Sequence, residues 1–215
     1  MKISHPIGAI LIASLIACNS PSDKTEKTAS NVGYKMDRTV LPIQPPPHEN
    51  MTTMDARDAE KPEPFVVDAP EGSPNIVVVL IDDIGFGATS TFGGAIHTPT
   101  FDKLADNGLR FNRFHTTALC SPTRASLLSG RNHHNVNVGS VMEVATGFYG
   151  NQGIRPDNAK YFAETLKQNG YSTAAFGKWH ETATWEVSVS GPYTRWPTNS
   201  GFDKFYGFIG GETNQ

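Results

Sequence analysis

The chain has 215 residues, a formal net charge of −3, 20 glycines and 15 prolines. Its length suits one domain with a hydrophobic core, and its near-neutral charge gives no basis for binding nucleic acid or a membrane surface by charge alone. The frequent glycines and prolines favour a loop-rich α/β protein over a helical bundle.

The first eighteen residues have the pattern of an export signal. Lys2 precedes an apolar run over residues 7–17, which is short for a transmembrane helix and suits a signal-peptide core. The run ends in "LIAC", which resembles the bacterial lipobox, so we expect lipid on Cys18. The predicted protein is an exported periplasmic or cell-envelope lipoprotein, and Asn19 favours the outer membrane. An ordinary secretory signal and a buried N-terminal helix are the alternatives.

Residues 19–38 are polar and predict a flexible tether, followed by extended polyproline over residues 41–50. We expect the globular part to be residues 39–215. Two cysteines in an exported chain often pair, but lipid on Cys18 and a site role for Cys120 argue against a disulfide between them.

The globular part alternates strand and helix patterns. The run "NIVVVLIDD", residues 75–83, predicts a parallel strand buried on both faces. Helices are expected over residues 98–108 and 157–170, and strands over residues 109–116 and 171–179. The residues expected to face inward are Phe101, Leu104 and Ala105 in the first helix and Phe162, Ala163 and Leu166 in the second. This order predicts a layered α/β fold with a largely parallel sheet.

A further helix is expected in "ALCSPTRASLLSGR", residues 118–131. Ser121 suits the N-cap, Pro122 the first helical position and Gly130 the stop. Cys120 then lies at a helix N-terminus, where free N–H groups and the helix dipole favour an anion and the thiolate. Arg124 adds a charge that grips an oxyanion, so the segment predicts an anion pocket with a reactive residue.

Three predicted strand ends carry polar side chains, and such ends gather ligands in parallel sheets. Asp82 and Asp83 close the first strand, Cys120 follows the second, and Lys178 and His180 close the third. Strand alternation places Lys178 and His180 on one face. Each piece alone also has an ordinary interpretation, namely a solvated turn, a structural cysteine or surface charge. Together they predict one pocket, in which paired carboxylates suit a hard cation.

These segments resemble one family. "CSPTRASLLSGR" is similar to the type I sulfatase motif, Cys-x-Pro-x-Arg followed by Gly-Arg, with Thr123 where Ser or Ala is commoner. "PNIVVVLIDDIGFG", "STAAFGKWHE" and "NSGFDKFYGFIGGETNQ" are similar to other segments of the larger bacterial arylsulfatases, in the same order. The resemblance covers roughly residues 39–215. It implies the N-terminal portion of an alkaline-phosphatase-like layered fold with a mostly parallel central sheet.

The resemblance also implies a mechanism. A maturation enzyme would oxidise Cys120 to formylglycine, whose hydrate attacks the sulfur of a sulfate ester and later expels sulfate. Asp82, Asp83 and the modified Cys120 would hold a divalent metal, Ca²⁺ first and Mg²⁺ or Mn²⁺ as alternatives. Arg124 would steady the hydrate and the substrate charge, Lys178 would bridge sulfate and leaving group, and His180 would assist proton transfer. These catalytic and metal-binding roles belong to the resemblance alone.

The implied partners are a sulfate-ester small molecule or glycan, the maturation enzyme and a membrane reached through the lipid anchor, without nucleic acid. The family's Asp-Asn metal pair, its other Lys and His and its C-terminal subdomain have no counterpart before Gln215. We therefore expect little or no activity from the 215 residues alone. A phosphoesterase or phosphonate hydrolase of the same superfamily, and an inert truncated lipoprotein, are the competing hypotheses.

Overall fold

The computed structural model describes residues 34–48 and 50–213. Its α-helices are α1 (Pro99–Asp106), α2 (Cys120–Ser129) and α3 (Phe162–Gln168), and its strands are β1 (Ala174–Lys178) and β2 (Lys204–Phe208). Short 3-10 turns lie between them: η1 (Ser90–Phe92), η2 (His133–Val136), η3 (Met142–Val144), η4 (Thr184–Glu186) and η5 (Pro197–Asn199). None of the helices in this part of the chain is both long and apolar enough to cross a membrane.

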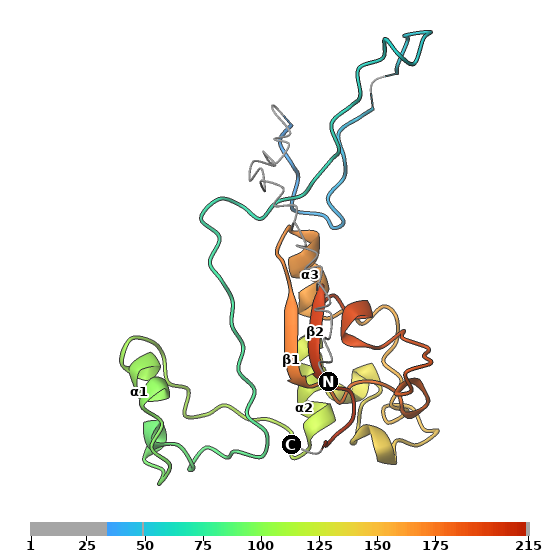
Figure 1. Cartoon of the computed structure of the whole chain (residues 1–215). Helices are drawn as coiled ribbons and strands as arrows, with labels where there is room; N and C mark the ends of the chain where they lie inside the picture. The colour runs from blue at the N-terminus through green and yellow to red at the C-terminus, as the bar shows by residue number, and fades with distance from the viewer. Residues whose placement is uncertain (1–33, 49, 214–215) are drawn as a thin grey trace, which may run out of the picture.

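The centre of the molecule is a parallel pair of strands packed with two helices. β1 and β2 pair in register from Ala174 opposite Lys204 to Lys178 opposite Phe208. α2 and α3 lie beside this pair, whereas α1 lies apart, beyond a long extended stretch (Figure 1). Gly177 and Gly207 face each other in the register, and a Cβ on Gly207 would lie 1.9 Å from the Gly177 carbonyl oxygen. Glycine at position 207 therefore permits the close approach of the two strands.

Two small apolar clusters flank α2 and hold its position. One contains Ala125, Val136, Val138, Met142 and Ala159, and the other contains Tyr161, Ala163, Trp179 and Phe202. Ala125 of α2 belongs to the first cluster, and Leu128, one turn later, packs against the second. Burial of these side chains removes apolar surface from water and fixes α2 against the end of β1.

The strands predicted over residues 75–83 and 109–116 do not form in the described part of the chain. Both segments are extended but unpaired, and their apolar side chains face solvent: Val77 is 83% exposed and Leu109 also 83%. A strand buried on both faces needs a paired neighbour on each side and covering helices. Among the described residues, β1 and β2 form strand pairs with each other and with no third strand. The apolar pattern alone therefore does not bring these segments into the sheet.

The predicted helices form with shifted ends. α1 begins at Pro99 after Thr98, as expected, but Leu104 is 66% exposed instead of facing inward. α3 covers only residues 162–168 of the predicted 157–170, with Ala163 buried. The sequence predicts β1 within residues 171–179 correctly. An α/β architecture with a parallel strand pair is therefore confirmed, although the described sheet has two strands rather than several.

The N-terminal segment reaches the body of the protein through Arg38. Its guanidinium group donates to the carbonyl oxygen of Asn169, 3.0 Å away, and to that of Asp68. Asn169 is the C-cap of α3, where free carbonyl groups favour a cation. The last residue of the predicted tether is thus anchored to α3. The predicted signal segment and Cys18 lie outside the described residues.

Candidate active site

α2 begins two residues earlier than predicted, so Cys120 is its first residue rather than the residue before its N-cap. Leu119 is the N-cap and makes no side-chain capping bond. Ser121 is therefore not the cap. It is buried inside the first turn, and its hydroxyl donates to the His180 carbonyl oxygen at 2.8 Å. Gly130 ends the helix with φ 66°, as predicted.

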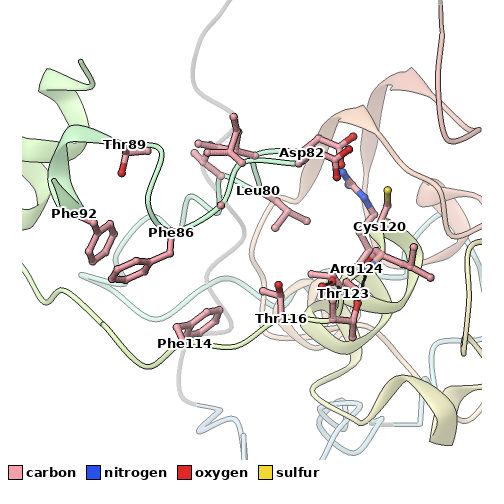
Figure 2. Close-up of a pocket in the computed structure, with 18 of the residues that line it drawn as sticks. Leu80, Asp82, Phe86, Thr89, Phe92, Phe114, Thr116, Cys120, Thr123 and Arg124 are labelled. Carbon is pink, nitrogen blue, oxygen red and sulfur yellow. Dashed lines mark hydrogen bonds between the residues drawn. The ribbon is translucent and has the colours of Figure 1, made fainter. Parts of the chain in front are cut away.

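A cavity of about 810 Å³ opens at this end of α2. Cys120 and Arg124 line it together with Asp82 and Asp83 from the turn after the extended segment (Figure 2). The opposite wall is aromatic, and the ring centroids of Phe86 and Phe92 lie 4.2 Å apart. The cavity thus joins a charged end to an apolar end, an arrangement that suits an ester with an anionic group and an apolar remainder.

Ligand atoms of Asp82, Asp83 and Cys120 all lie within 4.8 Å of one another. Both carboxylates are exposed to the cavity, and the thiol is partly buried. Asp83 has φ 52°, a left-handed conformation that aspartate tolerates better than most residues. The turn therefore directs two consecutive carboxylates toward the start of α2. The structure brings the three predicted metal ligands together across a sequence separation that no local pattern bridges.

Lys178 completes the charged end of the cavity from β1. Its Nζ lies 2.7 Å from Asp82 Oδ2, and its side chain is only 11% exposed. The hydrogen bond from Lys178 lowers the pKa of Asp82 most, and the nearby Arg124 charge and Cys120 thiol lower it further, against the opposing effect of burial. Burial alone would lower the pKa of Lys178, but its hydrogen bonds to Asp82 and Cys120 outweigh this and raise it. Both groups therefore stay charged at neutral pH.

Arg124 is fixed from the backbone of the same strand. Its Nη1 donates to the Lys178 carbonyl oxygen at 2.7 Å. Its Nε is buried and has no hydrogen-bond partner among the described residues. A buried guanidinium N–H without a partner is costly, and an anion in the cavity would satisfy it. Arg124 thus joins Asp82, Cys120 and Lys178 in one group.

His180 lies next to this group, but its ring is engaged elsewhere. β1 ends at Lys178 and His180 has φ 56°, so strand alternation no longer determines where its side chain points. Its Nε2 lies 2.7 Å from Glu143 Oε2, whereas Lys178 pairs with Asp82. We expected Lys178 and His180 to reach one ligand from the same face of the strand. His180 lies beyond the end of β1, so strand alternation does not place the two side chains together. The contact through Ser121 still places His180 beside the start of α2.

Two glutamates near the site carry no signal in the sequence. Glu143 is an isolated acid in the segment that forms η3, and Glu181 directly follows His180 in the sequence. Glu181 is fully buried, and the Tyr161 hydroxyl donates to its Oε2 at 2.7 Å. Burial raises the pKa of Glu181 to about 8, although the bond from Tyr161 and the charges of Arg155 and Arg124 lower it. Only the tertiary contacts identify these residues.

Comparison with known proteins gives matches to sulfatases, in agreement with the motifs of the sequence. A family model described as sulfatase matches residues 74–215. An uncharacterised sulfatase of Schizosaccharomyces pombe is 34% identical over 157 residues, which are 70% of this chain and 27% of that protein. An arylsulfatase of Klebsiella aerogenes is 31% identical over 148 residues, 68% of this chain and 30% of that protein. The crystal structure of Ps i-CgsB matches with 33% identity and a TM-score of 0.45, covering 62% of this chain and 27% of that one.

Proposed function

This chain belongs to the sulfatase family, with the alkaline-phosphatase-like α/β fold of that family, and on that premise we propose that it hydrolyses sulfate esters at Cys120. The chain spans about a quarter to a third of the length of the curated relatives it matches. In the proposed reaction, water is consumed, the S–O bond to the alcohol or phenol breaks, and the alcohol and sulfate leave. One observation carries the proposal: Asp82, Asp83, Cys120, Arg124 and Lys178 converge at the N-terminus of α2.

The charges at this site suit an anionic ester only if a cation is added. Two carboxylates and two basic side chains face one another, so their formal charges cancel before a substrate arrives. A sulfate ester is itself negative and would be repelled by Asp82 and Asp83. A divalent ion held by these carboxylates would remove that repulsion, and the N–H groups of α2 with Arg124 would then receive the ester oxygens.

The residues present fit such an ion in part. Carboxylate oxygens are good ligands for Ca²⁺, Mg²⁺ and Mn²⁺, whereas a thiol sulfur is a poor one for these hard ions. Asp82 and Asp83 would hold the ion, and an oxygen in place of the Cys120 sulfur would complete an all-oxygen group of three. When bound, the ion would screen the sulfate charge and lower the pKa of a coordinated hydroxyl. Ca²⁺ is our first choice because it accepts a flexible oxygen shell.

Conversion of Cys120 to formylglycine would supply that oxygen. The proposed maturation enzyme passes two electrons from Cys120 to an oxidant such as dioxygen, releases the sulfur as sulfide and puts oxygen in its place. The product is an aldehyde whose hydrate provides the nucleophilic hydroxyl. Arg124, one helical turn after Cys120, would hold the developing charge, and Lys178 would contact the sulfate oxygens and the leaving-group side. His180 would accept or return a proton beside Cys120. The substrate class is a sulfate-ester small molecule or glycan.

The modification state of Cys120 is the first test. The chain is co-expressed with a formylglycine-generating enzyme, and the tryptic peptide from Phe114 to Arg124 is analysed by mass spectrometry. We expect exchange of the thiol for an aldehyde, which also forms a hydrazone with a hydrazine reagent. An unmodified thiol in every peptide would contradict the proposal and favour an inert lipoprotein. If the full-length protein hydrolysed nitrophenyl phosphate faster than nitrophenyl sulfate, the result would favour a phosphoesterase instead.

We also propose that the protein is an exported lipoprotein of the cell envelope, anchored through Cys18. Support comes from the short apolar run that ends in "LIAC" and from the polar segment after it. Replacing Cys18 with serine is expected to move the protein from the membrane fraction to the soluble periplasmic fraction. Equal membrane association of the variant, measured by immunoblot of fractionated cells, would exclude a lipid anchor at this position.

A further inference from the structure

Both the backbone and the ring of His180 are held by other segments of the chain. Its backbone N–H donates to the Ile209 carbonyl oxygen at 3.0 Å, and its carbonyl oxygen accepts from Ser121 at 2.8 Å. Its Nε2 lies 2.7 Å from Glu143 Oε2, and the ring is buried. Backbone and ring are thus anchored to three separate segments of the chain.

Gly211 lies directly against the ring of His180. A Cβ built on Gly211 would lie 2.7 Å from His180 Cε1 and 2.9 Å from Nε2, closer than real Cβ atoms approach. The imidazole therefore packs directly against the backbone of Gly211. The contact with Gly211 and the bond between Nε2 and Glu143 together define the orientation of the ring.

Glu143 decides which nitrogen carries the proton. Burial alone would raise its pKa, but the hydrogen bonds from His180 and from backbone N–H groups outweigh burial and lower it. An ionised carboxylate only accepts hydrogen bonds, so Nε2 of His180 must be the donor. In a neutral imidazole the other nitrogen, Nδ1, is then unprotonated. His180 Nδ1 is buried and has no hydrogen-bond partner among residues 34–48 and 50–213.

We propose that Glu143 is a positioning residue that holds neutral His180 as the Nε2–H tautomer and so leaves Nδ1 as the proton acceptor of the site. The buried Nδ1, which has no partner in the described part of the chain, is the ring nitrogen that this arrangement leaves able to accept a proton. The use of Nδ1 in sulfate-ester hydrolysis rests on the proposed function. The tautomer itself does not, because the carboxylate of Glu143 imposes it on the folded chain without substrate.

The tautomer is measured directly by ¹⁵N NMR of the imidazole rings in the 215-residue chain above pH 7. His180→Gln identifies the His180 signals by their loss. We expect a protonated Nε2 and an unprotonated Nδ1 in the unchanged chain. Glu143→Gln should reduce this preference about tenfold or more, because an amide can donate as well as accept. Glu212→Gln removes a neighbouring exposed carboxylate and should leave the His180 signals unchanged.

The second measurement is the sulfatase activity of the full-length protein after Cys120 has been matured. Glu143→Gln should lower kcat for nitrophenyl sulfate by about 10-fold to 100-fold with little change in KM, and Glu143→Asp should restore part of the loss. An Nδ1–H tautomer in the unchanged chain, or the same tautomer ratio in Glu143→Gln, would overturn the inference. If NMR shows the expected tautomer but the matured protein has no sulfatase turnover, the proposed function is rejected. The positioning role of Glu143 toward His180 then still holds.

Discussion

Replacing Cys120 with alanine should abolish hydrolysis of nitrophenyl sulfate, a loss on the order of 10⁴-fold to 10⁶-fold in kcat for removal of a nucleophile. Cys120 is the first residue of α2, and alanine is the best helix former, so the helix should still begin at this position. Lys178 and Asp82 remain paired in the variant because their 2.7 Å contact does not involve the thiol. The loss should therefore appear in turnover and not in folding.

Cys18 offers the matched control for this experiment, since it is the other cysteine of the chain. Cys18→Ser should keep full turnover per molecule of enzyme whose Cys120 is matured. Both variants are compared with the unchanged protein, expressed from the complete reading frame, by steady-state kinetics and circular dichroism. Residual activity of Cys120→Ala above one per cent (roughly 10² below the unchanged protein) would show that another group supplies the nucleophile.

Glu181→Gln should make the chain's stability less dependent on pH. Glu181 is fully buried, and burial raises its pKa to about 8 from an ordinary 4.5. Between these two values the unfolded chain releases the proton while the folded chain retains it, so the folded state binds more protons. The stabilisation from protonated Glu181 is complete below pH 4.5 and is lost as pH rises toward 8, by about 1.4 kcal/mol per pH unit.

Glutamine stays neutral throughout this range and can still accept the hydrogen bond from Tyr161. The free energy of unfolding, measured with urea at pH 5, 6 and 7, should therefore fall more steeply with pH in the unchanged chain than in Glu181→Gln. Glu60→Gln, at an exposed position, should follow the unchanged chain. Parallel pH curves for the unchanged chain and Glu181→Gln would mean that Glu181 is already ionised in the folded protein at pH 5.

Local features of the sequence were sufficient for the elements closest to the chemistry. The presence of α2 and its stop at Gly130 are predictable, because helical hydrogen bonds join residues four apart and because Gly130 favours a left-handed conformation. β1 follows from a short apolar run after a helix stop. The adjacent carboxylates of Asp82 and Asp83 and the Cys-Ser-Pro-Thr-Arg motif identify the family, and the family model matches the same region.

Contacts between residues that are far apart in the sequence became known only from the tertiary structure. Residues 75–83 have a strong strand pattern, yet strand pairing needs a neighbour that the segment itself does not contain, and here it stays exposed. Asp82 meets Lys178 across 96 positions, and Glu143 meets His180 across 37. A positive φ at His180 turns its ring away from the strand pattern. The sequence by itself determined which groups are available at this site, because residue chemistry and helical contacts are local. Their pairing was settled by the packing of α2 against β1, because side-chain contacts across the fold exist only once the chain is folded.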